Sequence, residues 1–281
     1  MRNGVVLFSS DRGITPAELA RAAEERGFDT IYVPEHTHIP VRRDAAHPGT
    51  GDESLPDDRY TRTLDPWVSL ATAAAVTTKI RLATAVALPV ESDPITLAKT
   101  IATLDHLSGG RVTIGAGFGW NTDELEDHHV PAAKRRTVLR EYVEAMRALW
   151  TQDEAAYDGE FVKFGPSWAY PKPTQAHVPL IIGAGGGPKT FEWIARTADG
   201  WMTTPREEGI GEKAMALKKA WADAGRDGEP DIRVLIAAKP TPENFAEWAE
   251  AGAGELIWGV PDRSPDEVLA YLDRLAARLS G

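Results

Sequence analysis

Eight short apolar runs alternate with helix-like segments along the whole chain, and this alternation limits the fold more than any other feature. The runs are GVVLF (4–8), TIYVP (30–34), IRLATAVALPV (80–90), RVTIGAG (111–117), PLIIGAG (179–185), DGWMTT (199–204), IRVLIAA (232–238) and GELIWG (254–259). Their apolar residues are nearly continuous, which is typical of parallel strands covered on both faces. The pattern predicts a parallel α/β fold.

The helix starts share one signature, in which a capping residue stands directly before a proline. It occurs at Thr15-Pro16, Asp65-Pro66, Asp93-Pro94, Thr241-Pro242 and Ser264-Pro265. The capping oxygen can accept a hydrogen bond from an orphan amide, and proline needs no donor at the first helical position. Strand and capped helix, repeated eight times, predict an α/β fold of the (β/α)8 TIM-barrel type as a single domain, 1–281. A doubly wound sheet is the alternative.

Two segments do not fit this alternation. Residues 40–64 form a long polar loop after the second predicted strand, and such loops commonly serve as lids or binding loops or are partly disordered. Residues 153–178 are rich in aromatic residues and prolines, which predicts an insertion hairpin near the barrel mouth with Asp158-Gly159 as its turn.

Composition excludes several classes of function. The net charge is −11, from 31 basic and 42 acidic residues, so we expect no nucleic-acid partner. The chain has no cysteine, which excludes disulfides and thiolate metal sites. No apolar stretch approaches the roughly 20 residues of a membrane span, and the first ten residues do not resemble a cleavable signal. We therefore expect a cytoplasmic protein that does not bind membranes.

Two glycine clusters fall at predicted strand ends, where a barrel of this kind places its active site. Gly115, Gly117 and Gly119 precede Asn121 but do not form a dinucleotide-binding motif. A tight turn and a backbone opened for a ligand both remain possible, and the Asn121 amide could bond to such a ligand. The second cluster, 183–187, precedes Pro188. Its amides could hold a phosphate at the helix start, although a plain loop fits equally well.

The segment YVPEHTHIP (32–40) carries an acid and two histidines at the end of the second predicted strand. His36 and His38 could be half of a metal site, but the later strands end without matching ligands, so we expect no metal. Either histidine could instead bind a ligand or move a proton, and a histidine that is simply hydrogen-bonded in a loop is the structural alternative. Lys239 could in principle form a Schiff base, but a surface lysine before Pro240 is the simpler interpretation.

Five stretches together resemble the luciferase-like flavin and deazaflavin oxidoreductases, and the resemblance covers nearly the whole chain. The most specific is the run from Ile80 to Trp120, with its LDHLSGGR link. The others are GFDTIYVPEHTHIP, VLREYVEAMRALW, YPKPTQAHVPLIIGAGG and IARTADGWM. The resemblance implies a barrel that holds FMN or the deazaflavin coenzyme F420 at its mouth. The spacing of the motifs on the third and fourth strands is more similar to the F420 branch.

The resemblance also implies roles for single residues. Glu35 and His36 match the acid–histidine pair near the reactive edge of the cofactor, with His36 exchanging a proton and Glu35 holding it. Ala85-Val86 matches a bulge that supports the ring, often through a non-proline cis peptide. Gly117 and Asn121 match residues that contact the ring. Residues matching phosphate-binding amides are Gly183, Ala184, Gly185 and Gly186.

The sequence departs from the sugar-phosphate dehydrogenases of this family. It has Phe118 where they carry a carboxylate, and Ile39-Pro40 where they carry a tryptophan, which argues against that substrate. We expect an F420-dependent oxidoreductase that transfers a hydride to or from a small organic molecule. The alternatives are an FMN-dependent monooxygenase that uses reduced flavin and O2, a cofactor carrier without turnover, and a metal-dependent hydrolase. Since dimers are common in the family, we also expect a homodimer. Trp120, Trp168, Tyr170, Tyr60 and Trp258 could line an aromatic pocket.

Overall fold

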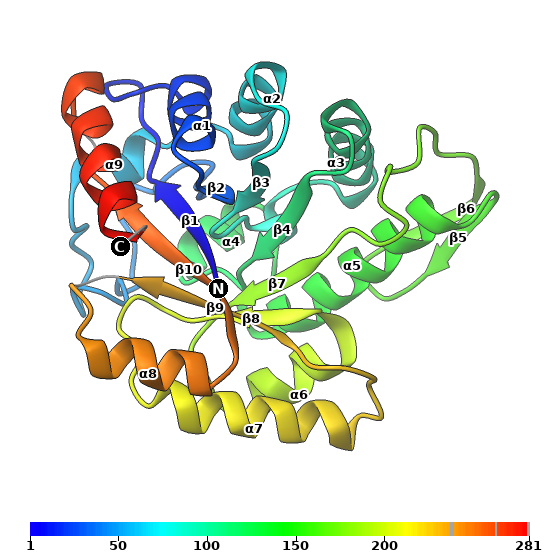
Figure 1. The fold of residues 1–281 in the computed structure, drawn as a ribbon. Helices are drawn as coiled ribbons and strands as arrows, with labels where there is room; N and C mark the ends of the chain where they lie inside the picture. The colour runs from blue at the N-terminus through cyan, green and yellow to red at the C-terminus, as the bar shows by residue number, and fades with distance from the viewer. Residues whose placement is uncertain (237–238, 262, 280–281) are drawn as a thin grey trace.

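The computed structural model describes residues 1–236, 239–261 and 263–279. Within them, eight parallel strands close into a barrel in chain order (Figure 1). They are β1 (Arg2–Leu7), β2 (Thr30–Val33), β3 (Arg81–Thr84), β4 (Val112–Ala116), β7 (Leu180–Gly183), β8 (Gly200–Met202), β9 (Asp231–Ile236) and β10 (Ala253–Val260). The pairing of β10 with β1 closes the ring, which confirms the predicted (β/α)8 barrel and rules out the doubly wound sheet.

Most of the strands end earlier than predicted. Residues 80–90 do not form one strand, because β3 ends at Thr84 and a short 3₁₀ helix, η2 (Pro89–Glu91), follows. Pro89 cannot donate to a strand ladder, and Pro34 limits β2 in the same way. The predicted end of the seventh run, at 237–238, lies outside the described residues.

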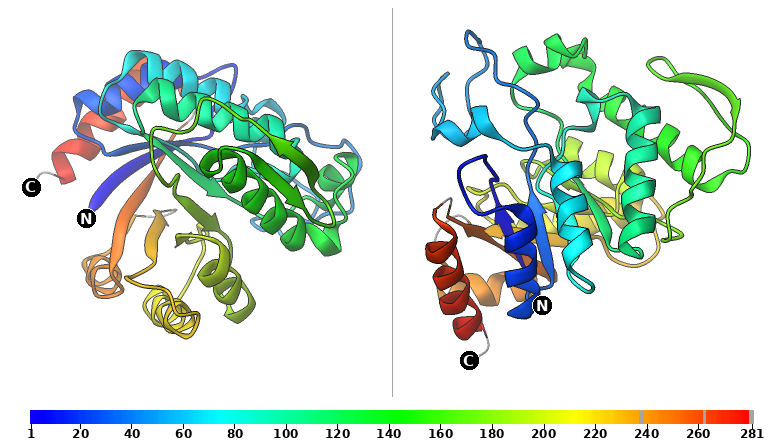
Figure 2. Two further views of the ribbon diagram at one scale, coloured as in Figure 1. Left: turned by 90° about the vertical axis from the view of Figure 1, so that its right-hand side faces the viewer. Right: turned by 90° about the horizontal axis from the view of Figure 1, so that it is seen from above.

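Helices surround the barrel on all sides (Figures 1 and 2). The described helices are α1 (Pro16–Glu25), α2 (Pro66–Val76), α3 (Pro94–Ser108), α4 (Thr122–Asp127), α5 (Arg135–Thr151), α6 (Pro188–Thr197), α7 (Ile210–Asp223), α8 (Pro242–Glu250) and α9 (Pro265–Leu279), with 3₁₀ turns η1 (Asp58–Arg62) and η3 (Ala132–Lys134). The predicted caps form: Thr15 accepts from the Glu18 amide, Asp65 from Val68 and Asp93 from Thr96. Among the described residues, no helix is both long enough and apolar enough to cross a membrane.

The apolar core has two parts. The larger one lies between the strands and the helices, and a smaller one fills the barrel interior with Tyr32, Ala83, Ile181, Met202 and Ile257. The burial of both faces of the strands explains why the apolar runs in the sequence are continuous.

Nearer the N-terminal ends of the strands, the barrel interior is charged. Arg233 of β9 is almost completely buried and donates to the Tyr32 hydroxyl at 2.7 Å and to Asp231 Oδ2 at 2.8 Å. Its Nη1 also lies 3.6 Å from Oε2 of the fully buried Glu255. One arginine therefore links three strands of the barrel from the inside.

The insertion hairpin forms, with two differences from the prediction. Its strands are β5 (Ala155–Asp158) and β6 (Lys163–Ser167), and Gly159 N donates to Val162 O at 2.8 Å. The turn therefore spans 159–162 rather than Asp158-Gly159 alone. The hairpin lies beyond α5 on the outside of the barrel (Figure 1), where the Phe161 amide donates to Glu141 Oε2 of α5 at 2.7 Å. This hydrogen bond to Glu141 holds the hairpin against α5 on the outside of the barrel. Only residues 161–163 of the hairpin line a cavity near the mouth.

Candidate active site

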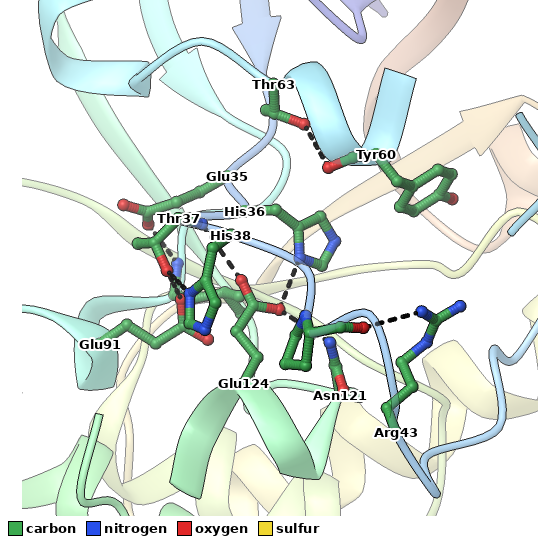
Figure 3. Close-up of polar contacts among 12 residues, drawn as sticks. Glu35, His36, Thr37, His38, Arg43, Tyr60, Thr63, Glu91, Asn121 and Glu124 are labelled. Atoms are coloured by element: carbon green, nitrogen blue, oxygen red, sulfur yellow. Dashed lines mark hydrogen bonds and ion pairs between the residues drawn. The ribbon is translucent and has the colours of Figure 1, made fainter. Parts of the chain in front are cut away.

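The end of β2 places His36 at the barrel mouth, where its side chain is mostly buried. Its Nδ1 lies 2.8 Å from Oε2 of Glu124, a fully buried carboxyl group on α4 (Figure 3). The other oxygen of Glu124 accepts from the Thr37 amide at 3.1 Å. Because Nδ1 is engaged in this pair, Nε2 is the ring nitrogen left to exchange a proton with a ligand.

Glu35 does not hold His36, contrary to the prediction from the resemblance. Its carboxylate points away from the imidazole ring (Figure 3), and Oε2 accepts from the Leu88 amide at 2.6 Å. The Glu35 amide in turn donates to Val86 O at 3.0 Å. Glu35 therefore ties the segment after β3 to the end of β2. Burial, with smaller contributions from the charges of Asp65 and Glu124, raises the pKa of Glu35 to about 7.

The raised pKa predicts that Glu35 lowers stability as the pH rises. In the unfolded chain the carboxyl ionises near its ordinary pKa of 4.5, but in the fold it holds its proton up to about 7. The folded protein therefore loses stability, on the order of 3 kcal/mol, as the pH rises from 4.5 to about 7. We expect the melting temperature to fall less between pH 5 and pH 8 in Glu35→Gln than in the wild type. Parallel melting curves for the two proteins would exclude this role.

Neither Glu124 nor its helix α4 was predicted from the sequence. Asn121 is the N-cap residue of α4, and its Nδ2 lies 3.3 Å from Glu124 Oε2. The Asn121-x-x-Glu124 spacing is that of a capping box, so this signal was present in the sequence. The amide oxygen of Asn121 is buried and has no hydrogen-bond partner in the described structure. A buried, unpaired acceptor beside His36 is a suitable contact for a ligand that donates a hydrogen bond.

The polar loop 40–64 brings aromatic rings beside His36. The Tyr60 ring lies 5.5 Å from the His36 ring, and His47 Nε2 is 3.0 Å from the Tyr60 hydroxyl. Trp120, which follows β4, completes this wall at 5.7 Å from His36. The loop is held to α4 where the amides of Asp44 and Ala45 donate to Asp123.

Three of the five aromatic residues that were predicted to line a pocket lie elsewhere. Trp168 and Tyr170 are exposed next to the hairpin, because that insertion packs on α5 rather than at the mouth. Trp258 is buried and faces α8, with its ring 6.3 Å from that of Phe245. Only Tyr60 and Trp120 belong to the wall around His36.

Ala85-Val86 is a non-proline cis peptide, as the resemblance implied. The glycines around it make room for Val86 itself. A Cβ added at Gly183 would overlap Cγ1 of Val86, and one at Gly117 would lie 2.7 Å from its Cγ2. A Cβ at Gly115 would overlap the Thr84 carbonyl. The glycines at the ends of β4 and β7 thus make room for the bulge after β3. Space for Val86 explains the need for glycine at 117 and 183 without any contact with a cofactor.

This packing predicts that Gly183→Ala destabilises the fold by about 1–3 kcal/mol, the usual cost of overpacking. Val86→Ala removes the obstructing methyl groups, so the double variant should lose less stability than the two single changes added together. Gly185→Ala is the matched control, since its Cβ would meet no atom within 4 Å. Strict additivity in denaturant unfolding would show that Val86 does not set the need for Gly183.

The loop that was predicted to hold a phosphate follows β7, and one of its amides is already engaged. Gly186 N donates to Glu207 Oε1 at 3.3 Å, and Lys213 Nζ makes an ion pair with the same oxygen. The Ala184 carbonyl accepts from Trp201 Nε1 at 2.8 Å, while Gly185 and Gly187 face open space. Gly187 is the N-cap residue of α6, and as a glycine it has no side chain to bond the first amides of the helix. The loop therefore fits an anion, provided that Glu207 withdraws from the amide and the lysine.

The second histidine and its neighbours belong to a separate group beside the His36–Glu124 pair. His38 Nε2 lies 2.9 Å from Asp127 Oδ2, and His128 Nε2 lies 2.7 Å from the Thr37 hydroxyl. His128 also has a carboxyl neighbour that was not predicted from the sequence, Glu91, whose Oε2 lies 4.0 Å from His128 Nε2. Within the described part of the chain, no three His, Asp or Glu side chains are grouped so that they could hold a metal ion.

Comparison with known proteins agrees with this architecture. A family model described as luciferase-like monooxygenase matches residues 15–280. The uncharacterized protein Rv0953c of Mycobacterium tuberculosis is 68% identical over 280 residues, which is 100% of this chain and 99% of that protein. An F420-dependent glucose-6-phosphate dehydrogenase of Nakamurella multipartita is 33% identical over 191 residues, 67% of this chain and 51% of that enzyme. The crystal structure of monooxygenase RslO1 from Streptomyces bottropensis has a TM-score of 0.77 at 22% identity, covering 99% of this chain and 98% of RslO1.

Proposed function

Because the chain belongs to the luciferase-like monooxygenase family, we propose that it is an oxidoreductase that uses coenzyme F420 to exchange a hydride with a small organic substrate. The observation that carries the proposal is the buried His36–Glu124 pair at the barrel mouth, beside the unpaired amide oxygen of Asn121. The name of the Nakamurella relative supports F420 as the cofactor.

The residues at the mouth suit a planar ring with an anionic tail. The ring would be held by the Ala85-Val86 bulge and Asn121, and the tail by the loop of Gly183, Ala184, Gly185 and Gly186. F420, when bound, would supply the hydride carrier, and the protein would orient it and exclude water. His36 would exchange a proton through Nε2, and Glu124 would fix the orientation of the ring by binding Nδ1.

Turnover with a panel of alcohols, ketones and unsaturated carbonyl compounds tests this proposal. Oxidation or reduction of F420 is followed by its absorbance, and we expect at least one compound class to give enzyme-dependent change. The alternative is an FMN-dependent monooxygenase, and the matching family model is described as luciferase-like monooxygenase. Such an enzyme would instead consume O2 when given reduced FMN. Oxygen consumption with FMN, and no reaction with F420, would overturn the proposal in favour of this alternative.

Glu207→Gln should increase the affinity for phosphate-bearing cofactors. The change removes a mostly buried negative charge from the Gly186 amide and releases Lys213. We expect the affinity for F420 and FMN to rise by roughly fivefold, equivalent to about 1 kcal/mol. Riboflavin, which lacks the phosphate, is the matched control and should bind equally to both proteins. Equal gains for riboflavin and FMN would place the phosphate elsewhere.

A further inference from the structure

Glu207 precedes α7 and places its carboxylate on the loop after β7, where the anionic tail of the cofactor is proposed to bind. Its Oε1 accepts from the Gly186 amide at 3.3 Å and makes an ion pair with Lys213 Nζ. Its Oε2 accepts from the Thr204 hydroxyl at 2.9 Å. The Glu207 side chain is almost completely buried. An amide, an ammonium and a hydroxyl thus surround one buried anion that belongs to the chain itself.

Lys213 is held at this loop by its packing as well as by its charge. It lies near the start of α7, which packs beside α6 (Figure 1). Its stem runs so close to the backbone of the loop that a Cβ added at Gly186 would be 2.9 Å from Lys213 Cδ. This contact does not depend on Glu207. The ammonium group should therefore remain at the loop after the Glu207 carboxylate has moved away.

We propose that Lys213 and Thr204 are ligands of the cofactor's phosphate, and that Glu207 takes the place of this phosphate until the cofactor binds. The inference rests on the proposed function, which places the anionic tail at this loop. A phosphate in the position of the carboxylate would receive the same three donors on its terminal oxygens. Hydrogen bonds to such an ionised acceptor are roughly twice as strong as those between neutral groups.

A local ion pair is the competing interpretation of the same contacts. Glu207 and Lys213 lie on either side of the start of α7, so their pairing could serve only to fix this helix. Both interpretations agree that Glu207→Gln releases Lys213, but they differ in what the lysine then does. A phosphate ligand contributes affinity in the Glu207→Gln background, whereas a residue that only pairs with Glu207 contributes none.

Titration of inorganic phosphate into Glu207→Gln, at constant ionic strength, tests the assignment without any cofactor. Binding is followed by the chemical shift of the Gly186 amide in ¹⁵N NMR spectra. Adding Lys213→Met to this background should weaken phosphate binding by roughly tenfold, the lower end for a hydrogen bond to a charged group. Adding Thr204→Val should weaken it by roughly threefold, as expected for loss of one hydroxyl donor.

Lys218→Met in the same background is the matched control. Lys218 also belongs to α7, and its side chain is 35% exposed compared with 33% for Lys213, but its Nζ lies 3.2 Å from Glu229 Oε2. This change removes the same charge from the same helix and should leave phosphate affinity unchanged. Equal affinities of the Lys213→Met and Lys218→Met double variants would overturn the assignment. Absence of any phosphate-induced shift at Gly186 in Glu207→Gln would overturn it as well.

Titration of FMN and riboflavin into the same variants gives a second arm. Lys213→Met in the Glu207→Gln background should weaken the binding of FMN and leave that of riboflavin, which lacks the phosphate, unchanged. Equal losses for both ligands would place Lys213 away from the phosphate. Failure of F420 and FMN to bind at all would instead contradict the proposed function, and the titration with inorganic phosphate would still decide the roles of Lys213 and Thr204.

Discussion

Replacing His36 with alanine should lower turnover by roughly 10²–10⁴-fold, the contribution of a positioned general acid or base, and leave cofactor affinity nearly unchanged. The expectation follows from the geometry of the pair. Glu124 engages Nδ1 at 2.8 Å, so the ring is fixed with Nε2 as the exchanging nitrogen. Steady-state kinetics with F420 and a substrate found in the panel, combined with F420 titration, measures both quantities.

His38→Ala is the matched control for this prediction. His38 is partly exposed and bonds to the exposed Asp127, so its removal should change turnover little. If His36→Ala retains wild-type turnover, His36 does not exchange the proton. If both variants lose cofactor binding, the segment after β2 acts in binding rather than in the chemical step.

Replacing Arg233 with methionine should destabilise the fold by about 3–5 kcal/mol, because removal of one partner leaves buried charge uncompensated. The guanidinium bonds to Tyr32 and Asp231 and lies 3.6 Å from the fully buried Glu255. These opposing groups also hold the pKa of Arg233 above its ordinary value, despite the burial that lowers it. Urea unfolding of the variant and the wild type gives the difference in free energy.

Two further variants separate the charge effect from packing. Glu255→Leu in the Arg233→Met background removes the buried carboxylate that would then face only Arg2, at 3.6 Å, and should restore part of the lost stability. Arg12→Met breaks an exposed ion pair with Asp58 and should cost less than about 1 kcal/mol. If Arg233→Met lowers the free energy of unfolding no more than Arg12→Met does, the buried ion pairs of Arg233 do not stabilise the barrel.

The barrel could be predicted because its determinants are local. Apolar runs such as PLIIGAG identify strands that are buried on both faces, and a capping residue before proline marks the start of α1, α2, α3, α8 and α9. Thr15 and Asp93 cap their helices as their sequences predict. The strand ends were harder, because β3 stops at Thr84 although its apolar run continues to Val90, while β2 stops directly before Pro34.

The site could be predicted only in part, since its contacts join segments far apart in the chain. His36 was found from its place after a strand, but its partner Glu124 is 88 residues away on a helix of six residues. The role of Gly183 depends on Val86, which comes from another strand, and no local pattern reports that contact. The hairpin was placed wrongly for the same reason, because Glu141 of α5 determines where it packs.

The central claim is that the barrel mouth binds a planar redox cofactor beside His36. Fluorescence titration of the purified chain with F420 and with FMN tests it most directly. We predict saturable binding of one F420 per chain, with a lower Kd than for FMN. If neither cofactor binds at millimolar concentration, the claim is contradicted, although the barrel itself would remain.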